Sequence, residues 1–209
     1  MTTTKGFTLI ELLIVIGILA ILATTVVLVL NPAQILQETR DTQRISDLGS
    51  INSAIGLYLA TASSIDMAVV GQCRGATGAV NWWATRTGTV NPYTAFAAPE
   101  TGITQHANIA RTVDGNGWVP VNLALVSGGS PLAALPIDPT NTGTNLLTTG
   151  DLFYTYTCGG TGNGTTFEID ANMESAKFDS GGGGSDVEST DGGNQPLIYE
   201  VGNAANLTL

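Results

Sequence analysis

The sequence predicts an α+β protein, in which a long N-terminal helix is followed by a small antiparallel β-sheet. Three observations support this class. An apolar run extends to Leu30 with Glu11 as its one charged residue, and an apolar pattern of helical period continues from Ala33 to about Ala62. Segments that alternate with a period of two then lie near the C-terminus. Helical patterns followed by a group of short strand patterns are typical of α+β proteins.

The first helix is long enough to cross a membrane. Phe7 to Leu30 comprises 24 residues, or about 36 Å of helix, and the hydrocarbon core of a bilayer is about 30 Å thick. Glu11 is expensive there, because a carboxylate in the apolar layer costs on the order of 2.5–3.5 kcal/mol. It therefore needs a partner or a role. A signal peptide or signal anchor is the alternative, but the single Lys5 and the lack of a clean small-residue cleavage site weigh against it.

The residues around Glu11 form a recognisable motif. They read Lys5-Gly6-Phe7-Thr8-Leu9-Ile10-Glu11 and continue Leu12-Leu13-Ile14-Val15-Ile16. This stretch resembles the class III signal of type IV prepilins and of the pseudopilins of type II secretion systems. The resemblance implies cleavage after Gly6 by a prepilin peptidase and N-methylation of the new amino terminus at Phe7. It also implies a filament in which Glu11 faces the Phe7 ammonium of a neighbouring subunit. Residues 1–6 would be the leader, and residues 7–30 the transmembrane and assembly helix.

Residues 31–62 are predicted to form an amphipathic helix that continues into the head. Asn31-Pro32 marks a kink, a short melted stretch or a new helix start, because proline disfavours a helical conformation at the preceding residue. The expected apolar face consists of Ile35, Ile45, Leu48, Ile51, Ile55, Tyr58, Leu59 and Ala62. We expect the charged residues of the first half to be solvated or, alternatively, to make lateral contacts between subunits; they are Glu38, Arg40, Asp41, Arg44 and Asp47. An Asp41–Arg44 pair on such a surface is worth only a few tenths of a kcal/mol.

Residues 63–209 are predicted to form a β-rich globular head with a loop-rich middle. The candidate strands are Ala79–Ala84, Trp118–Val126 and Leu197–Val201, together with a β-hairpin made of Leu152–Cys158 and Thr165–Ala171. Leu135-Pro136-Ile137-Asp138-Pro139 predicts an extended, turn-forming segment. This turn followed by an aromatic strand pair resembles the core of major pseudopilins and of several minimal pilins. The resemblance also implies that the second half of the long helix packs on the sheet.

Two pairs of residues in the head leave alternatives open, and the single histidine has one expected setting. Trp82 and Trp83 are either buried in a strand or loop or form an exposed adhesive patch. His106 is expected to be a solvated loop residue. Cys73 and Cys158 lie 85 positions apart, and an oxidising compartment favours a disulfide that would stabilise the fold by roughly 4–5 kcal/mol. Two unpaired buried cysteines are the alternative, because spacing alone does not show their separation.

The charge balance of the chain and its glycine-rich segment 179–193 indicate whether nucleic acid or calcium is to be expected as a ligand. The chain has 7 basic and 17 acidic residues, and loss of the leader would leave 6 and 17, a formal charge of −11. This argues against non-specific binding to nucleic acid, and no specific nucleic-acid site is evident. Calcium is the one candidate cofactor, and its candidate ligands in this segment are Asp179, Asp186, Glu188 and Asp191. The resembling major pseudopilins bind calcium in a late loop, although the spacing here matches no EF-hand. A solvated acidic loop is the alternative.

The sequence predicts a structural protein and not an enzyme. His106 lies in no catalytic motif, and the glycine runs lack the lysine of a phosphate loop. The prediction is a structural subunit of a type IV pilus-like filament. The alternatives are a major-type pseudopilin of a type II secretion system and a monomeric membrane-anchored binding protein. The expected partners are identical or homologous pilin subunits, prepilin peptidase, an inner-membrane assembly platform and, before assembly, the lipid bilayer. Because Lys5 precedes the helix, we expect a single pass through the bacterial cytoplasmic membrane with a cytoplasmic N-terminus, and a cell-surface filament after assembly.

Overall fold

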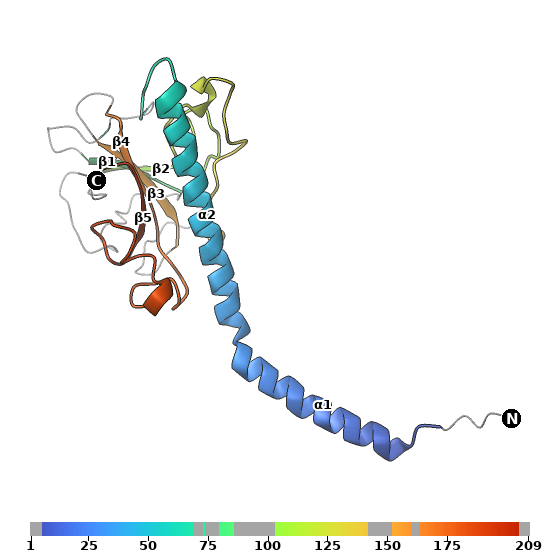
Figure 1. Ribbon diagram of the computed structural model, residues 1–209. Helices are drawn as coiled ribbons and strands as arrows, with labels where there is room; N and C mark the ends of the chain where they lie inside the picture. The colour runs from blue at the N-terminus through green and yellow to red at the C-terminus, as the bar shows by residue number, and fades with distance from the viewer. Residues whose placement is uncertain are drawn as a thin grey trace. The chain divides into compact units, whose positions relative to one another are not determined.

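The computed structural model describes residues 6–68, 73, 80–85, 103–141, 152–159 and 164–204 (Figure 1). The chain divides into two compact units, Met1–Gln37 and Glu38–Leu209. Its helices are α1 (Leu9–Leu30) and α2 (Pro32–Thr61), its strands are β1 (Val80–Ala84), β2 (Ile103–Ala107), β3 (Tyr154–Gly159), β4 (Thr166–Ala171) and β5 (Tyr199–Gly202), and its short 3₁₀ turns include η2 (Leu123–Leu125) and η3 (Gly183–Ser185).

Asn31 separates the two helices. Its φ of 38° places it in the left-handed region, where it ends α1, and it is the one described non-glycine residue with a positive φ. Asparagine tolerates this conformation better than most side chains. Pro32 then begins α2, and a proline is well placed at a helix start because its missing N–H would be unpaired there anyway. Of the three predicted possibilities, the structure shows a new helix start.

The sheet of the second unit has five strands in the order β2-β1-β3-β4-β5. β3 pairs antiparallel with β4, with Tyr156 opposite Ile169, so the predicted hairpin is confirmed. The pairs β1–β3 and β4–β5 are also antiparallel, whereas β1 and β2 run parallel. The α+β class is therefore confirmed, with a sheet that is mostly rather than wholly antiparallel.

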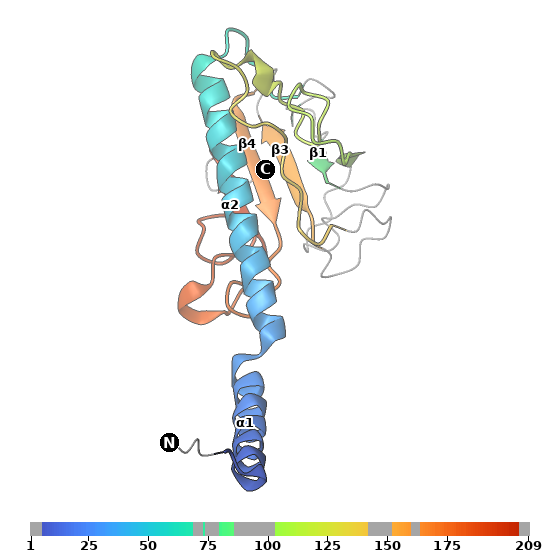
Figure 2. The same ribbon diagram turned by 90° about the vertical axis from the view of Figure 1, so that its right-hand side faces the viewer.

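α2 covers one face of this sheet, and Figure 2 shows it running alongside β3 and β4. Leu48, Ile51 and Tyr58 on α2 are fully buried against the sheet. The strand residues on this face are Tyr154, Tyr156, Cys158, Phe167, Ile169 and Ala171. Because successive strand residues point to opposite faces, Glu168 and Asp170 lie on the face away from α2. Burial of each large apolar side chain stabilises the head by about 1.5–3 kcal/mol.

The predicted strand Trp118–Val126 is wrong. The segment contains the 3₁₀ turn Leu123–Leu125, and its one bridge pairs Asn122 with Asp114. Pro120 cannot donate to a strand ladder, which explains why the apolar residues around it are buried without strand pairing. β2 was not predicted at all.

Candidate functional site

The start of α1 is organised by reciprocal contacts between Thr8 and Glu11. The Thr8 hydroxyl accepts a hydrogen bond from the Glu11 backbone N–H at 3.3 Å. The Glu11 carboxylate accepts from the Thr8 backbone N–H at 2.9 Å and from the Thr8 hydroxyl at 2.8 Å. These contacts form a capping box. A carboxylate at this position is also favoured by the helix dipole. Glu11, which is costly in an apolar segment, thus has polar partners within its own chain.

The rest of α1 presents an apolar surface. Leu9–Val27 is long and apolar enough to cross a membrane, and none of it is buried within the structure. The hydroxyls of Thr24 and Thr25 donate to the carbonyls of Ala20 and Leu22, each at 2.8 Å. The helix therefore satisfies its own threonines and is suited to lipid or to other apolar helices.

Arg44 forms a buried ion network between α2 and the turn at residues 135–139. Its side chain is fully buried, and its guanidinium donates to Asp138 and to Asp41 at 2.6 Å each. Burial by itself lowers the pKa of Arg44, but the two carboxylates outweigh burial and the net shift is upward. The expectation of a solvated Asp41–Arg44 surface pair is therefore wrong.

Asp41 extends this network to the segment after β4. Its two carboxylate oxygens accept from the backbone N–H groups of Glu174, at 3.0 Å, and Ser175, at 2.8 Å. Arg40 pairs with the Glu174 carboxylate, and this hydrogen bond lowers the pKa of Glu174. The head is thus fixed to α2 by charged contacts as well as by apolar packing.

Cys73 and Cys158 are joined by a disulfide. Both residues are buried, and Cys158 lies on the core face of β3 beneath α2. The bond closes a loop with a sequence separation of 85. The structure therefore contains the disulfide rather than two unpaired cysteines.

The carboxylates of the acidic loop at residues 179–193 accept hydrogen bonds from backbone N–H groups of the loop itself and of the flanking residues Met173 and Glu200. Asp186 accepts from the N–H groups of Gly181 and Ser189, Glu188 from those of Met173 and Ser180, and Asp191 from those of Gly193 and Glu200, while Asp179 accepts from Ser180. Within the described residues, none of the four carboxylates belongs to a group of three that could share one metal ion. Calcium binding by these four residues stays a prediction.

A different set of carboxylates lies on the sheet face away from α2. Asp170 of β4 stands opposite Glu200 of β5 and opposite Thr155 of β3. Glu168 lies two positions before Asp170 on the same face. One oxygen from each of Glu168, Asp170 and Glu200 lies within 4.8 Å of the other two, and all three residues are buried. We call these three residues the strand cluster.

The strand cluster is electrostatically crowded. Burial raises the pKa of Asp170 to about 7, against hydrogen bonds from Thr155 and Glu168 that lower it. Burial likewise raises the pKa of Glu200 to about 8, and the nearby charges of Asp170 and Asp191 add to this shift. Three hard oxygen donors brought together in this way match the ligands of Ca²⁺ and Mg²⁺.

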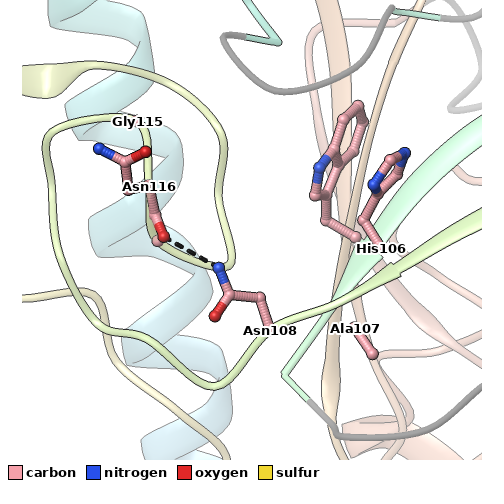
Figure 3. A pocket seen from close by; sticks show the side chains of 7 residues that line it. His106, Ala107, Asn108, Gly115 and Asn116 are labelled. Atoms are coloured by element: carbon pink, nitrogen blue, oxygen red, sulfur yellow. Dashed lines mark hydrogen bonds between the residues drawn. The ribbon is translucent and has the colours of Figure 1, made fainter.

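A cavity of about 470 Å³ lies at the edge of the sheet beside β2 (Figure 3). Its described lining residues are Trp83, His106, Ala107, Asn108, Gly115, Asn116 and Gly117. The Asn108 side chain donates to the Asn116 carbonyl at 2.9 Å across one side of it. The described lining contains amides and an imidazole but no carboxylate, so it supplies no acid–base pair for catalysis.

The structure decides between the two alternatives for the tryptophans and corrects the expectation for His106. Trp82 and Trp83 lie in β1 and are 0% and 2% exposed, so burial in a strand is confirmed and the alternative of an exposed adhesive patch is wrong. His106 lies in β2 rather than in a solvated loop, its ring stacks on Trp83 at a centroid distance of 5.0 Å, and its Nε2 lies 3.2 Å from Asn81 Oδ1. Burial lowers the pKa of His106.

The comparisons with known proteins bear on the N-terminal segment. The prokaryotic N-terminal methylation motif matches residues 1–27, which include Gly6, Phe7 and Glu11. This segment is a prepilin signal. No curated protein and no solved structure matches the chain.

The prepilin signal supports a structural subunit of the type IV pilin or pseudopilin kind. The fold agrees with this assignment, because an N-terminal apolar helix, a second helix and a mostly antiparallel sheet are pilin-like. The signal and the apolar α1 together fit a membrane-anchored subunit. Gly6 and Phe7 precede α1 within the matched motif, and Glu11 lies in the first turn of that helix.

Two groups of residues were missed at the sequence level. The Arg44 network depends on Asp138 and Glu174, which lie 94 and 130 positions away. The strand cluster had a local signal, because Phe167-Glu168-Ile169-Asp170 alternates apolar and acidic residues. That pattern alone does not show that β5 pairs with β4 and brings Glu200 alongside Asp170.

Proposed function

We propose that this chain is the structural subunit of a type IV pilus-like filament, cleaved between Gly6 and Phe7 and assembled through α1. The observation that carries this proposal is the prepilin signal at residues 1–27, which ends in an exposed apolar helix. Prepilin peptidase would cut the leader, and the new amino terminus at Phe7 would be N-methylated. Lys5 on the leader side favours a cytoplasmic N-terminus before assembly, with the chain after Leu30 outside the cytoplasm.

Glu11 would act when the subunit leaves the membrane and joins the filament. In the uncut chain its carboxylate is satisfied by the N–H and hydroxyl of Thr8. Cleavage creates a cation at Phe7, and a neighbouring subunit's Phe7 ammonium can then pair with Glu11 in the apolar surroundings of packed helices. Identical or homologous subunits would supply the lateral partners, after delivery by an inner-membrane assembly platform.

The experiment that tests this role changes Glu11 in the full-length gene. Glu11→Ala should leave membrane insertion and cleavage intact, because neither the apolar run nor the Gly6-Phe7 pair is altered. Filaments should be absent from sheared surface material viewed by electron microscopy, while immunoblots show processed subunit in the membrane. Normal filaments from Glu11→Ala would refute the assembly role.

Glu11→Gln is the matched control for helix capping. Glutamine also serves at this position of a capping box, but it carries no charge. If the ion pair with Phe7 is what matters, Glu11→Gln fails to assemble just as Glu11→Ala does. Full assembly of Glu11→Gln would assign Glu11 to the helix cap instead.

A pseudopilus of a type II secretion system is the second candidate. It is favoured by the turn at residues 135–139, whose Asp138 is held by Arg44, since this turn resembles that of major pseudopilins. The disulfide and the polar loops favour a surface pilus. Long surface filaments at native expression support the pilus, and filaments that require overexpressed secretion machinery support the pseudopilus. The third candidate, an anchored binding protein that uses Trp82 and Trp83, loses its basis because both side chains are buried.

A further inference from the structure

We propose that Glu168, Asp170 and Glu200 form a binding site for Ca²⁺ on the sheet face away from α2. The site lies on β4 and β5 and not in the acidic loop, where calcium was expected from the sequence. It does not depend on how the subunit is used, because all three ligands belong to the head.

The coordination preferences of the two ions favour calcium over magnesium in the strand cluster. One oxygen from each of the three carboxylates lies within 4.8 Å of the others. Ligands on opposite sides of Ca²⁺ are about 4.6–5.2 Å apart, because each Ca–O distance is about 2.3–2.6 Å. Mg²⁺ demands near-ideal octahedral geometry and gives up its water reluctantly, so three buried carboxylates suit it less well. One Ca²⁺ between the three carboxylates is therefore compatible with the 4.8 Å limit on their oxygens, and water would complete its coordination.

Two oxygens of the cluster lack partners. Asp170 Oδ1 and Glu200 Oε1 are buried with no hydrogen bond, although the two residues are only 5% and 2% exposed. Within the described part of the chain, no lysine or arginine forms an ion pair with either residue. A buried carboxylate oxygen that has neither a donor nor a cation is costly. A divalent cation would satisfy both oxygens at once.

The other oxygens of the same two residues are held in place. Asp170 Oδ2 accepts from the Thr155 hydroxyl at 2.6 Å, and Glu200 Oε2 accepts from the Gln195 N–H at 2.8 Å. Gly193 packs so closely that a Cβ there would lie 2.0 Å from Glu200 Oε2. Each carboxylate is therefore oriented by one oxygen while the other is left for a ligand, and this preorganisation favours ion binding.

The test uses the full-length chain in detergent micelles and follows thermal unfolding in chelator, in CaCl₂ and in MgCl₂. With calcium about 100-fold above its dissociation constant, the unfolding midpoint should rise by at least about 5 °C. Magnesium should give a clearly smaller rise. Calorimetric titration should show one calcium per chain. No shift with calcium would overturn the proposal and would indicate that the three carboxyls share protons instead.

Asp170→Asn and Glu200→Gln are the decisive variants. Each should abolish the calcium shift, and each should be at least as stable as the wild-type chain in chelator, because it removes a crowded buried charge. Asp186→Asn is the matched control in the acidic loop and should keep the full shift. A shift that survives in both strand variants, or that is lost in Asp186→Asn alone, would overturn the strand site. Glu11→Ala should keep the shift, so failure of the filament proposal is distinguishable from failure of this one.

Discussion

At the scale of single residues, His106 reports directly on the packing of the head, because the chain contains one histidine. Its ring stacks on the buried Trp83, and its Nε2 lies beside the Asn81 side chain. Burial disfavours the charged imidazolium, which is why the pKa of His106 is lowered. The neutral ring is the form that the folded head prefers.

We predict that His106 titrates below the ordinary histidine pKa of about 6.5. Since the folded-state pKa is lowered, the stabilising contribution of the neutral ring is present above the unfolded-state pKa and is lost as the pH falls below it. Proton NMR of the imidazole signals measures the titration in the detergent-solubilised chain, and the chain unfolded in urea is the reference. A folded-state midpoint equal to or above the unfolded one would contradict the buried, stacked environment.

At the scale of elements, the Arg44 network fixes α2 to the turn at residues 135–139. We predict that Arg44→Met destabilises the head by about 3–5 kcal/mol, because Asp41 and Asp138 would remain buried without their cation. Urea unfolding of the full chain in micelles measures the change. Lys177→Ala is the control, since the exposed Lys177–Glu38 pair at 3.2 Å is worth at most about 1 kcal/mol. Equal losses in the two variants would contradict a special role for the buried network.

The elements with strong local patterns were predictable. The hairpin followed from Tyr154-Thr155-Tyr156-Thr157 and its alternating partner across a glycine-rich turn. Proline chemistry predicted an interruption at Asn31-Pro32 but did not distinguish a new helix start from a kink or a melted stretch. β2 was not predictable in this way, because its parallel pairing with β1 is a contact between segments that no hairpin turn joins. The apolar residues near Pro120 were read as a strand, although burial alone does not require one.

The candidate sites likewise divide into those formed by contiguous residues, which were predictable, and those formed by distant segments, which were not. The prepilin signal was predictable because all of its residues are contiguous in sequence. The strand cluster and the Arg44 network were not, since each depends on a partner from a distant segment, Glu200 in one case and Asp138 in the other. The disulfide partners could be proposed from the expected compartment, but their contact required the fold.

At the scale of the whole molecule, the disulfide ties the core strand β3 to Cys73 across a sequence separation of 85. We predict that loss of this bond costs roughly 4–5 kcal/mol in the chain-entropy model, because the unfolded chain gains freedom over a long loop. Denaturant unfolding with and without reductant measures the loss. The Cys73→Ala/Cys158→Ala double variant is the control and should not respond to reductant. Unchanged stability of the wild-type chain after full reduction would contradict the prediction.

The alternation in β4 has a consequence for how the sheet finds its pairing. Phe167 and Ile169 face α2, and Glu168 and Asp170 face the other way. If β4 slipped by one residue against β3, both acids would enter the aromatic core beside Tyr154 and Tyr156, and the apolar side chains would leave it. In the native register Asp170 accepts a hydrogen bond from the Thr155 hydroxyl. A slip would break this contact and place both carboxylates among aromatic side chains, which costs more. The acidic residues of β4 therefore help to select the native register of the hairpin during folding. Every shift by an odd number of residues would move both carboxylates into the aromatic core, whether or not an ion is bound.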